Sequence, residues 1–486
     1  MQAISTLTFG QRFLALPPAF YRRVQPQPLS QPHLVALNAS LCETLGILPA
    51  TLEQPDALAL LSGNRLAHDM QPLAAMYAGH QFGVYVPQLG DGRAILLGDM
   101  LDTEGRCWEW QLKGAGLTPF SRMGDGRAVL RSTIREYLCS EAMHGLGIPT
   151  TRAVAMIGSP DPVYRERPET AAVLTRLAES FVRFGSFEVF YHRGQHDEIR
   201  LLADFIIRHH FPDCAQQEQP YAALFAEIVS RTARMIAQWQ AVGFCHGVMN
   251  TDNMSVLGLT LDYGPFGFMD GFNAAHVCNH SDHAGRYAYN QQPQVGLWNL
   301  HCLASAFLPL VSEAQLLEAL SGYREQYSQH WQGLMRNKLG LAVPDEGDDA
   351  LIEALLLAMH AHQTDYTVFF RRLADFDSAG DNHALRDMFL DRSLFDDWAA
   401  RYTARLQLET RPAAERRSAM LAVNPKYILR NYLAEQAIQA AQQGDFSQIA
   451  SLHHCLQHPF DEQPQYQAYA AEPPAWAQEI SVSCSS

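Results

Sequence analysis

The chain has 486 residues, 47% hydrophobic and 18% charged, an ordinary globular composition that excludes disorder over most of its length. Its net charge of -15, with 51 acidic and 36 basic residues and no dense run of lysine or arginine, argues against nucleic acid as the main partner. The first residues lack a signal-peptide pattern, no stretch of about 18 apolar residues occurs, and the nine scattered cysteines form no secreted disulfide framework. A cytoplasmic protein without membrane contact is therefore expected.

The first part of the chain predicts an extension followed by a small sheet. Residues 1–75 are rich in proline and are expected to form an N-terminal extension of short helices and loops that packs on a later domain. Three apolar runs, 84–89, 93–100 and 106–113, then predict strands, and the Asp/Gly turns between them favour a meander.

A lysine and a glutamate follow in an informative order. Period two in the third strand separates Trp110 from Lys113, so Lys113 is expected on the polar face, where it can meet a ligand. Residues 127–149 have helical spacing and predict a helix that carries Glu136, although Glu136 could instead close a capping box with Thr133. Lys113 alone would more often be an exposed lysine at a strand end. A glycine turn, a strand lysine and a helical glutamate in this order are typical of a kinase small lobe.

Two copies of the string D-G-R-A flank the lysine strand. The first follows Gly90 and contains Gly92 and Arg93, and the second contains Asp125 and Gly126. Turns of this kind can form a nest of backbone N–H groups for an anion, so both could contact a nucleotide. They are also ordinary hairpin chemistry, and both interpretations stay open.

The rest of the chain predicts one more strand and then mainly helices. A strand is expected at 171–180 after a proline-rich break at 159–168, and a long helix at 221–244. Further helices are expected at 298–310, 350–370 and 425–443. The whole pattern favours an α+β fold of the two-lobed protein-kinase type. Its expected parts are the N-terminal extension, a small lobe at 76–180, a mainly helical large lobe at 181–420, and a helical C-terminal extension with a cysteine-containing tail at 421–486.

The string HGVMNTDN at 246–253, followed by LDYG, matches the order of a kinase catalytic loop and metal-binding motif. Val248 stands where the catalytic aspartate is expected, and valine cannot accept a proton, so ordinary kinase chemistry cannot start from this position. Asp252 could supply the missing carboxylate. Asn253 and Asp262 offer oxygen ligands, which Mg²⁺ prefers.

Other interpretations of this region stay open. N-T-D-N and D-Y-G are common turn chemistry. The string MDGF offers Asp270 as a competing metal ligand, but Asp262 is preferred because it follows the apolar run 256–261, expected to be a strand. The loop that follows contains four residues that could bind zinc, His276, Cys278, His280 and His283. Their spacing matches no strong zinc signature, so an ordered activation-like loop is favoured.

Several long strings together resemble one family. They include YAGHQFG, PQLGDGRA, DGRAVLRSTIREYL, HGVMNTDNMS, LDYGPFGFMD and NPKYILRNYLAEQAI, and they span the chain from about residue 70 to its end. This set resembles the selenoprotein O family of protein adenylyltransferases, whose members have a kinase-like fold and transfer AMP to protein hydroxyls. The resemblance implies that ATP binds with Mg²⁺ or Mn²⁺ in a reversed orientation, with the γ-phosphate buried and pyrophosphate as the leaving group.

The resemblance also implies roles for the basic residues. Arg176 and Arg183 would by themselves be taken for surface ion-pair residues, but by similarity they would hold the β- and γ-phosphates together with Lys113. Lys113 would form a structural ion pair with Glu136. The nucleotide site would also be lined by Gly90, Gly92, Arg93, Asp125, Gly126 and Asp262.

By the same resemblance, Asn253 and Asp262 would carry the metal, and Asp252 would be the catalytic base for a Ser, Thr or Tyr hydroxyl. The expected partners are protein substrates, with self-modification and a monomeric state. Three alternatives remain: Mn²⁺-dependent UMP transfer, a phosphotransferase kinase, and an inactive pseudokinase scaffold, which Val248 suggests.

The tail SVSCSS also resembles the family, because its animal members carry selenocysteine near the chain end. Here that position offers Cys484. A disulfide between Cys278 and Cys484, which would link activity to oxidation state, is one expectation. A free thiol on a frayed tail is the other.

Overall fold

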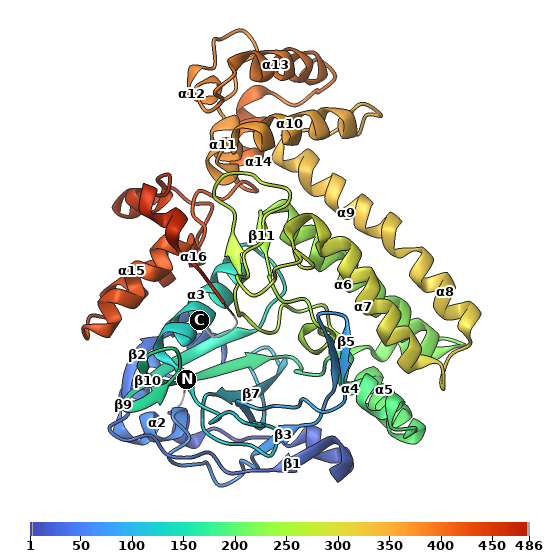
Figure 1. Ribbon diagram of the computed structural model, residues 1–486, viewed down its shortest axis with the longest axis vertical. Coiled ribbons are helices and arrows are strands. Elements are labelled where there is room, and N and C mark those ends of the chain that lie inside the picture. Colours follow the sequence, from blue (N-terminus) through green and yellow to red (C-terminus); the bar gives the residue numbers. More distant parts are fainter. Residues whose placement is uncertain (2, 484–486) are drawn as a thin grey trace.

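The computed structural model describes residue 1 and residues 3–483. A large sheet forms one end of the molecule, helices α10 to α14 form the other end, and further helices lie between them (Figure 1). This mixture of one sheet and many helices agrees with the expected α+β class. None of the helices in the described part of the chain combines the length and apolar character needed to cross a membrane.

The main sheet has eight strands, and all of its pairs are antiparallel. Its order is β1-β3-β6-β7-β10-β9-β2, with β8 beside β10. The strands are β1 Tyr21–Arg23, β2 His33–Leu37, β3 Leu73–Ala75, β6 Ala94–Leu101, β7 Cys107–Lys113, β8 Ala128–Val129, β9 Arg152–Tyr164 and β10 Pro168–Ala178. The predicted hairpin of β6 and β7 is confirmed. Both edge strands, β1 and β2, come from the first 75 residues, so the N-terminal region completes the sheet.

Two strand predictions are wrong in part. The run that begins at Val84 forms β5 Val84–Val86, which pairs with β4 Gly79–Gln81 in a separate hairpin and does not extend the meander. The predicted break at 159–168 is instead the outer half of β9 and its turn into β10. Beyond Gly158, β2 no longer pairs with β9, so the outer parts of β9 and β10 form a two-stranded ribbon with free edges, where prolines are tolerated.

Sixteen α-helices occur in the described residues. They are α1 Ala39–Thr44, α2 Pro55–Leu61, α3 Leu130–Gly145, α4 Phe184–His192, α5 His196–His210, α6 Pro220–Ala241, α7 Gln292–Phe307, α8 Glu313–Ser321, α9 Tyr323–Lys338, α10 Asp348–His362, α11 Tyr366–Leu373, α12 His383–Arg386, α13 Arg392–Leu406, α14 Ala413–Leu421, α15 Asn431–Gln442 and α16 Ser447–Gln457. The helices predicted at 127–149, 221–244, 298–310 and 425–443 correspond to α3, α6, α7 and α15, but the one predicted at 350–370 is divided into α10 and α11 by a break at Gln363, which has a left-handed backbone conformation. Because α3 begins at Leu130, Thr133 lies inside it and donates to the Val129 carbonyl. The capping-box interpretation of Glu136 is therefore wrong.

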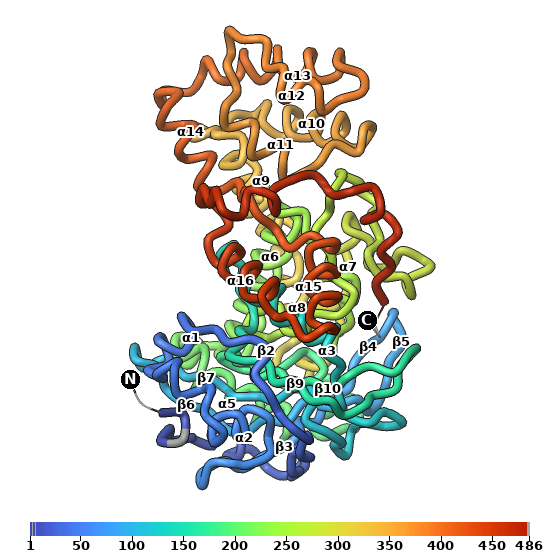
Figure 2. Tube along the Cα trace, turned by 90° about the vertical axis from the view of Figure 1, so that its left-hand side faces the viewer, coloured from blue at the N-terminus to red at the C-terminus, as the bar shows by residue number. Residues whose placement is uncertain are grey.

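Both faces of the sheet are covered. Helices α3, α15 and α16 pack together near one face, and the N-terminal helices α1 and α2 lie on the other (Figure 2). Trp110 and Leu112 of β7 are completely buried against the N-terminal segment. A separate apolar cluster holds α9 to α14 together. The sheet is therefore rigidly supported where its inner strands present side chains to the helical body.

Candidate active site

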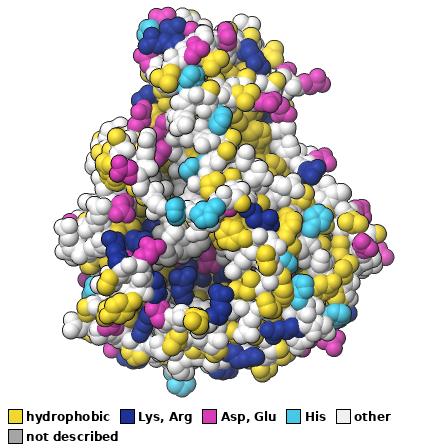
Figure 3. Space-filling model, in the orientation of Figure 1, with side chains coloured by type: hydrophobic (Ala, Val, Ile, Leu, Met, Phe, Trp, Pro, Cys, Tyr) yellow, Lys and Arg dark blue, Asp and Glu magenta, His cyan; other side chains and the backbone are white. Residues whose placement is uncertain are grey.

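A cavity of about 820 Å³ lies between the sheet and the helical body. Lysine and arginine side chains gather around a hollow in this part of the molecule (Figure 3). The cavity lining includes each of the residues predicted for catalysis, nucleotide or metal binding, and the structural ion pair: Gly90, Gly92, Arg93, Lys113, Asp125, Gly126, Glu136, Arg176, Arg183, Asp252, Asn253 and Asp262. Its volume is in the range of pockets that enclose small ligands and cofactors.

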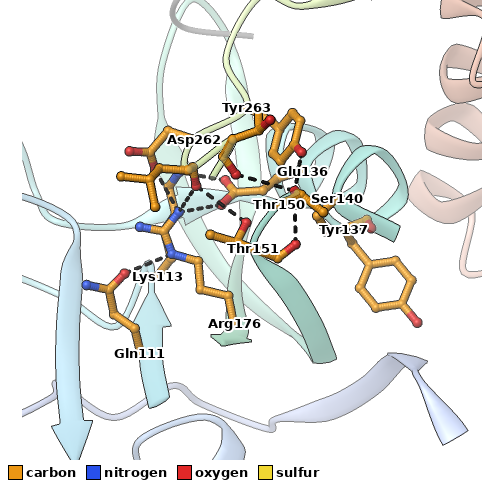
Figure 4. Close-up of polar contacts among 12 residues, drawn as sticks. Gln111, Lys113, Glu136, Tyr137, Ser140, Thr150, Thr151, Arg176, Asp262 and Tyr263 are labelled. Carbon is orange, nitrogen blue, oxygen red and sulfur yellow. Dashed lines mark hydrogen bonds and ion pairs between the residues drawn. The ribbon is translucent and has the colours of Figure 1, made fainter. Parts of the chain in front are cut away.

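One carboxylate at the inner end of the cavity is surrounded by three cations. Asp262 Oδ1 lies 3.1 Å from Lys113 Nζ and 2.6 Å from Arg176 Nη1. Its Oδ2 lies 2.6 Å from Arg183 Nη1. Glu136 pairs with Lys113 at 2.6 Å and with Arg176 at 2.8 Å (Figure 4). Together with Arg183, these residues form a network of three cations and two carboxylates. The network therefore carries one more positive charge than negative charge when all of its members are ionised.

The sheet register brings these residues together. Arg176 on β10 lies directly opposite Gln111 on β7, and its Nε donates to Gln111 Oε1 over 2.8 Å. Lys113 is two residues further along β7 and so projects from the same face. Helix α3 brings Glu136 to this face, and Arg183 lies immediately before α4.

Burial and charge act in opposite directions on Asp262. Burial disfavours its charged form, yet the surrounding arginines and lysine outweigh this effect and hold its pKa well below the ordinary value. The carboxylate therefore stays ionised. It stands in for the anion that this group of cations would otherwise attract.

Asp252 has a different environment. Burial raises its pKa to about 6, although a hydrogen bond from Gln81 and the charge of Arg183 act against this change. Gln81 Nε2 donates to Asp252 Oδ2 over 3.1 Å, while Oδ1 has no hydrogen-bond partner and packs against Gly79. A carboxylate that lines the cavity and has a raised pKa is suited to accept a proton.

The donors for a metal ion are hard oxygen atoms. Asn253 Nδ2 donates to the Val248 carbonyl over 2.9 Å, which leaves its amide oxygen as an acceptor in the cavity lining. Asp262 supplies the only carboxylate of this pair. An amide oxygen and a carboxylate fit Mg²⁺ or Mn²⁺, which take oxygen ligands.

The segment before Asp262 differs from the prediction. The run 256–261 was expected to be a strand, but it forms only isolated bridges, so Asp262 follows an irregular loop.

The two glycine turns both line the cavity, and each packs against the segment 116–121. Gly90 has a φ of +78° and Gly126 a φ of +68°, a backbone region that other residues rarely adopt. A Cβ on Gly126 would lie 2.0 Å from the carbonyl oxygen of Gly116, and a Cβ on Gly92 would lie 2.9 Å from that of Phe120. Both turns are therefore packed too closely for a side chain.

The arginines of the two D-G-R-A strings have different positions. Arg93 is exposed and lines the cavity. Arg127 instead donates to the backbone carbonyl of Gln27 and does not line the cavity. Asp125 is held by the Arg165 guanidinium at 2.8 Å. Only the first string therefore directs its arginine to the cavity.

The competing assignments find no support among the described residues. Asp270 does not line the cavity and pairs with the buried Arg430, which also contacts Asp365 at 2.9 Å. The four residues of the zinc alternative, His276, Cys278, His280 and His283, do not bring three ligand atoms within metal-binding distance of one another.

Three residues of the cavity lining contact the predicted site or carry charge, although the sequence did not predict a role for them. The ring of Tyr77 lies under the Arg183 guanidinium, 4.8 Å away, and Asp91 is a buried carboxylate that accepts from the backbone N–H of Ala75 over 3.0 Å. The third is Gln81, the partner of Asp252. Tyr77 and Gln81 both belong to the string YAGHQFG. That string was the one feature of the sequence that could have pointed to them as site residues.

The two cysteines of the expected disulfide can be placed only in part. Cys278 Sγ donates to the Cys245 carbonyl over 3.4 Å, and Cys484 lies outside the described residues. The backbone N–H of His280 donates to the Val482 carbonyl over 2.9 Å. The end of the described chain therefore runs beside the loop that carries Cys278.

Comparison with known proteins agrees with the motifs. Residues 3–457 match the family model described as protein adenylyltransferase SelO. The protein nucleotidyltransferase YdiU of Thiobacillus denitrificans is 55% identical over 489 aligned residues that cover 100% of both chains. Proteins of the same name from Myxococcus xanthus and Pseudomonas putida are 52% and 50% identical, also over 100% of both chains. These matches confirm the resemblance that the sequence strings indicated.

Proposed function

We propose that this chain, which belongs to the SelO family of protein adenylyltransferases, transfers AMP from ATP to Ser, Thr or Tyr hydroxyls of proteins and releases pyrophosphate. Membership of the family makes it a nucleotidyltransferase enzyme that acts on proteins. The choice of nucleotide, the acceptor residue and the roles of individual side chains are the proposal.

The observation that carries it is the group of cations around Asp262. The side chains of Arg176 and Arg183 are only 2% and 3% exposed, and that of Lys113 is 17% exposed. ATP carries most of its charge on the β- and γ-phosphates, and these would replace Asp262 as partners of the cations. The γ-phosphate would then point inward. This orientation leaves the α-phosphate nearer to the mouth of the cavity.

Asn253 and Asp262 would hold Mg²⁺ or Mn²⁺. When bound, the ion would neutralise part of the phosphate charge. It would also be the cationic partner of Asp262 once Lys113, Arg176 and Arg183 bind the phosphates.

Asp252 would accept the proton of the attacking hydroxyl. The hydroxyl oxygen forms a bond to the α-phosphorus, the bond from that phosphorus to the bridging oxygen breaks, and pyrophosphate leaves with the electron pair. Lys113, Arg176 and Arg183 would stabilise the charge that develops on pyrophosphate. The same chemistry on its own exposed hydroxyls would give self-modification.

The nucleotide is tested with label in the base. The protein is incubated with adenine-labelled ATP or uracil-labelled UTP, with Mg²⁺ or Mn²⁺, and the label retained on protein is measured. Retention of adenine label supports AMP transfer. Retention of uracil label alone would replace it with UMP transfer, and retention of neither would contradict both.

We also infer that the fold is of the protein-kinase type. The support is the Lys113–Glu136 ion pair between a strand and a helix, and the loop 246–253 that follows β11, Phe244–Cys245, at the edge of a helical body. The proposed division is an N-terminal extension at 1–75, a small lobe at 76–180, a large lobe at 181–420 and a C-terminal extension at 421–486. A monomeric, cytoplasmic protein is part of the same proposal.

Redox control is the last part of the proposal. A peroxide could take two electrons from the thiols of Cys278 and Cys484, forming one sulfur–sulfur bond and releasing two protons. The support is the hydrogen bond that sets Val482 beside His280. Burial raises the pKa of the Cys278 thiol well above its ordinary value, so this thiol would react slowly as a nucleophile.

A further inference from the structure

A second group of metal-ligand side chains lies outside the nucleotide cavity. It consists of His80 on β4, Glu188 on α4 and Cys302 on α7, and one possible ligand atom from each residue lies within 4.8 Å of the others. It is the one group of three or more His, Cys, Asp or Glu residues with this spacing in the part of the chain that the structure describes. We propose that His80, Glu188 and Cys302 form a zinc site.

The glutamate of this group is held in place. Glu188 is 1% exposed, its Oε2 accepts from Thr251 Oγ1 over 2.7 Å, and its Oε1 lies 3.2 Å from His80 Nδ1. Supporting hydrogen bonds of this kind orient the carboxylate and histidine ligands of metal sites. The Glu188 carboxylate is therefore oriented before an ion binds.

The donor atoms favour zinc over the ions expected in the nucleotide cavity. Nitrogen, oxygen and thiolate sulfur together suit Zn²⁺, whereas Mg²⁺ and Mn²⁺ prefer oxygen. His192 lies one helical turn after Glu188 on α4, and its ring centroid is 6.0 Å from that of His80. A water molecule, or the exposed His192 after a movement of its side chain, would complete a tetrahedral set.

The thiol must lose its proton for this site to fill. Burial raises the pKa of Cys302 to about 12, the charge of Glu188 raises it further, and Arg286 opposes them. On binding, the sulfur–zinc bond forms and the thiol proton passes to solvent.

The site has a structural connection to the proposed base. The backbone N–H of His80 donates to Thr251 Oγ1 over 2.7 Å, and Thr251 directly precedes Asp252. The next residue of β4, Gln81, donates to Asp252 itself. An ion shared by β4, α4 and α7 would therefore fix the hairpin against the loop that carries the base.

The test uses the full chain with Zn²⁺, and with Co²⁺ as a spectroscopic substitute. We expect one equivalent of Zn²⁺ bound outside the nucleotide site and a thiolate-to-cobalt absorption band. Cys302→Ser should remove the band and lower the Zn²⁺ affinity by at least about 10–100-fold. Loss of a residue that only supports a metal ligand already has an effect of this size. Cys107→Ser, at a half-buried thiol on β7, and Asp262→Asn, in the nucleotide cavity, keep the band.

A second measurement needs only the unaltered protein. Bound Zn²⁺ should protect Cys302 from alkylation by iodoacetamide, as read by peptide mass spectrometry, while Cys107 reacts equally with and without the ion. Absence of the cobalt band, or a band that survives Cys302→Ser, would overturn the proposal. So would equal alkylation of Cys302 in both conditions at a pH high enough for the ion-free thiol to react.

Discussion

Arg183 and Asp262 form an ion pair of 2.6 Å although they are 79 residues apart in the chain. The same carboxylate also meets Lys113 and Arg176, so Asp262 neutralises a cationic pocket that would otherwise attract phosphate. This competition between a carboxylate of the protein and the phosphates of a ligand has a measurable consequence.

Replacing Asp262 by Asn should separate nucleotide binding from transfer. Without its carboxylate competitor, the pocket should bind metal-free ATP about tenfold more tightly, equivalent to about 1.4 kcal/mol. Transfer should fall by about 10²–10³ or more because the proposed metal ligand is lost. Titration calorimetry in the presence of a chelator measures the first effect. Asp270→Asn, outside the cavity, should bind ATP like the unaltered protein. Weaker metal-free binding by Asp262→Asn would contradict this account of the pocket.

Asp252 should make both transfer and stability depend on pH. Because its pKa is raised from 3.8 to about 6, transfer should rise through about pH 6 and then level off as the base ionises. The folded state binds this proton more tightly than the unfolded state. Burial of the charged carboxylate therefore lowers the free energy of unfolding by nothing below pH 3.8 and by its full amount above about pH 6.

Asp252→Asn should therefore lose transfer and gain stability relative to the unaltered protein as the pH rises, by at most about 3 kcal/mol. Thermal unfolding at pH 5 and pH 8 measures the change. A difference in melting temperature that is the same at both values would show that burial does not raise this pKa.

Gly126→Ala should weaken ATP binding by more than the backbone strain of a positive φ alone would cause. The new Cβ would meet the Gly116 carbonyl at 2.0 Å in addition to the strain of a positive φ, which costs about 1–2 kcal/mol. Gly105→Ala is the matched control, because its φ is +81° and nothing lies within 4 Å of its Cβ. Only Gly126→Ala should weaken ATP binding. Equal ATP affinity in the two variants would exclude this turn from the site.

Oxidation should join Cys278 to Cys484. Non-reducing peptide maps after mild peroxide treatment should contain the linked peptides in the unaltered protein and in Cys107→Ser, but not in Cys484→Ser. Transfer should respond to peroxide only where the link can form. Finding Cys278 as a free thiol in the oxidised protein would rule out this pairing.

Local sequence patterns were sufficient to predict the helices and strands whose apolar residues recur at regular spacing. Helices α3 and α6 have apolar residues at helical spacing, and β7 and β10 are short apolar runs with turns at their ends. Strands β1, β2 and β9 were not predicted. β1 has only three residues, and the pairing of β2 with β9 joins residues more than 100 apart, which local patterns do not show. The exposed outer half of β9 likewise tolerates prolines that would normally end a strand.

The site was predictable as a set of residues but not as a network. The strings and their order identified Lys113, Glu136 and Asp262. They could not show that Arg176 and Arg183 both contact Asp262, because these contacts depend on the register between β7 and β10 and on the position of α4. The partner of Asp252, Gln81, was missed for the same reason, since a separate hairpin brings it to the loop.

The central claim is that ATP binds with its γ-phosphate inward and gives up AMP. Parallel reactions with ATP labelled at the α- or the γ-phosphorus, with Mg²⁺ or Mn²⁺, test it directly when protein-bound label is read on a gel. We predict label from the α position only, and none from either position in Asp252→Ala. Label from the γ position only would mean a phosphotransferase, and the roles proposed for Arg176 and Arg183 would be contradicted.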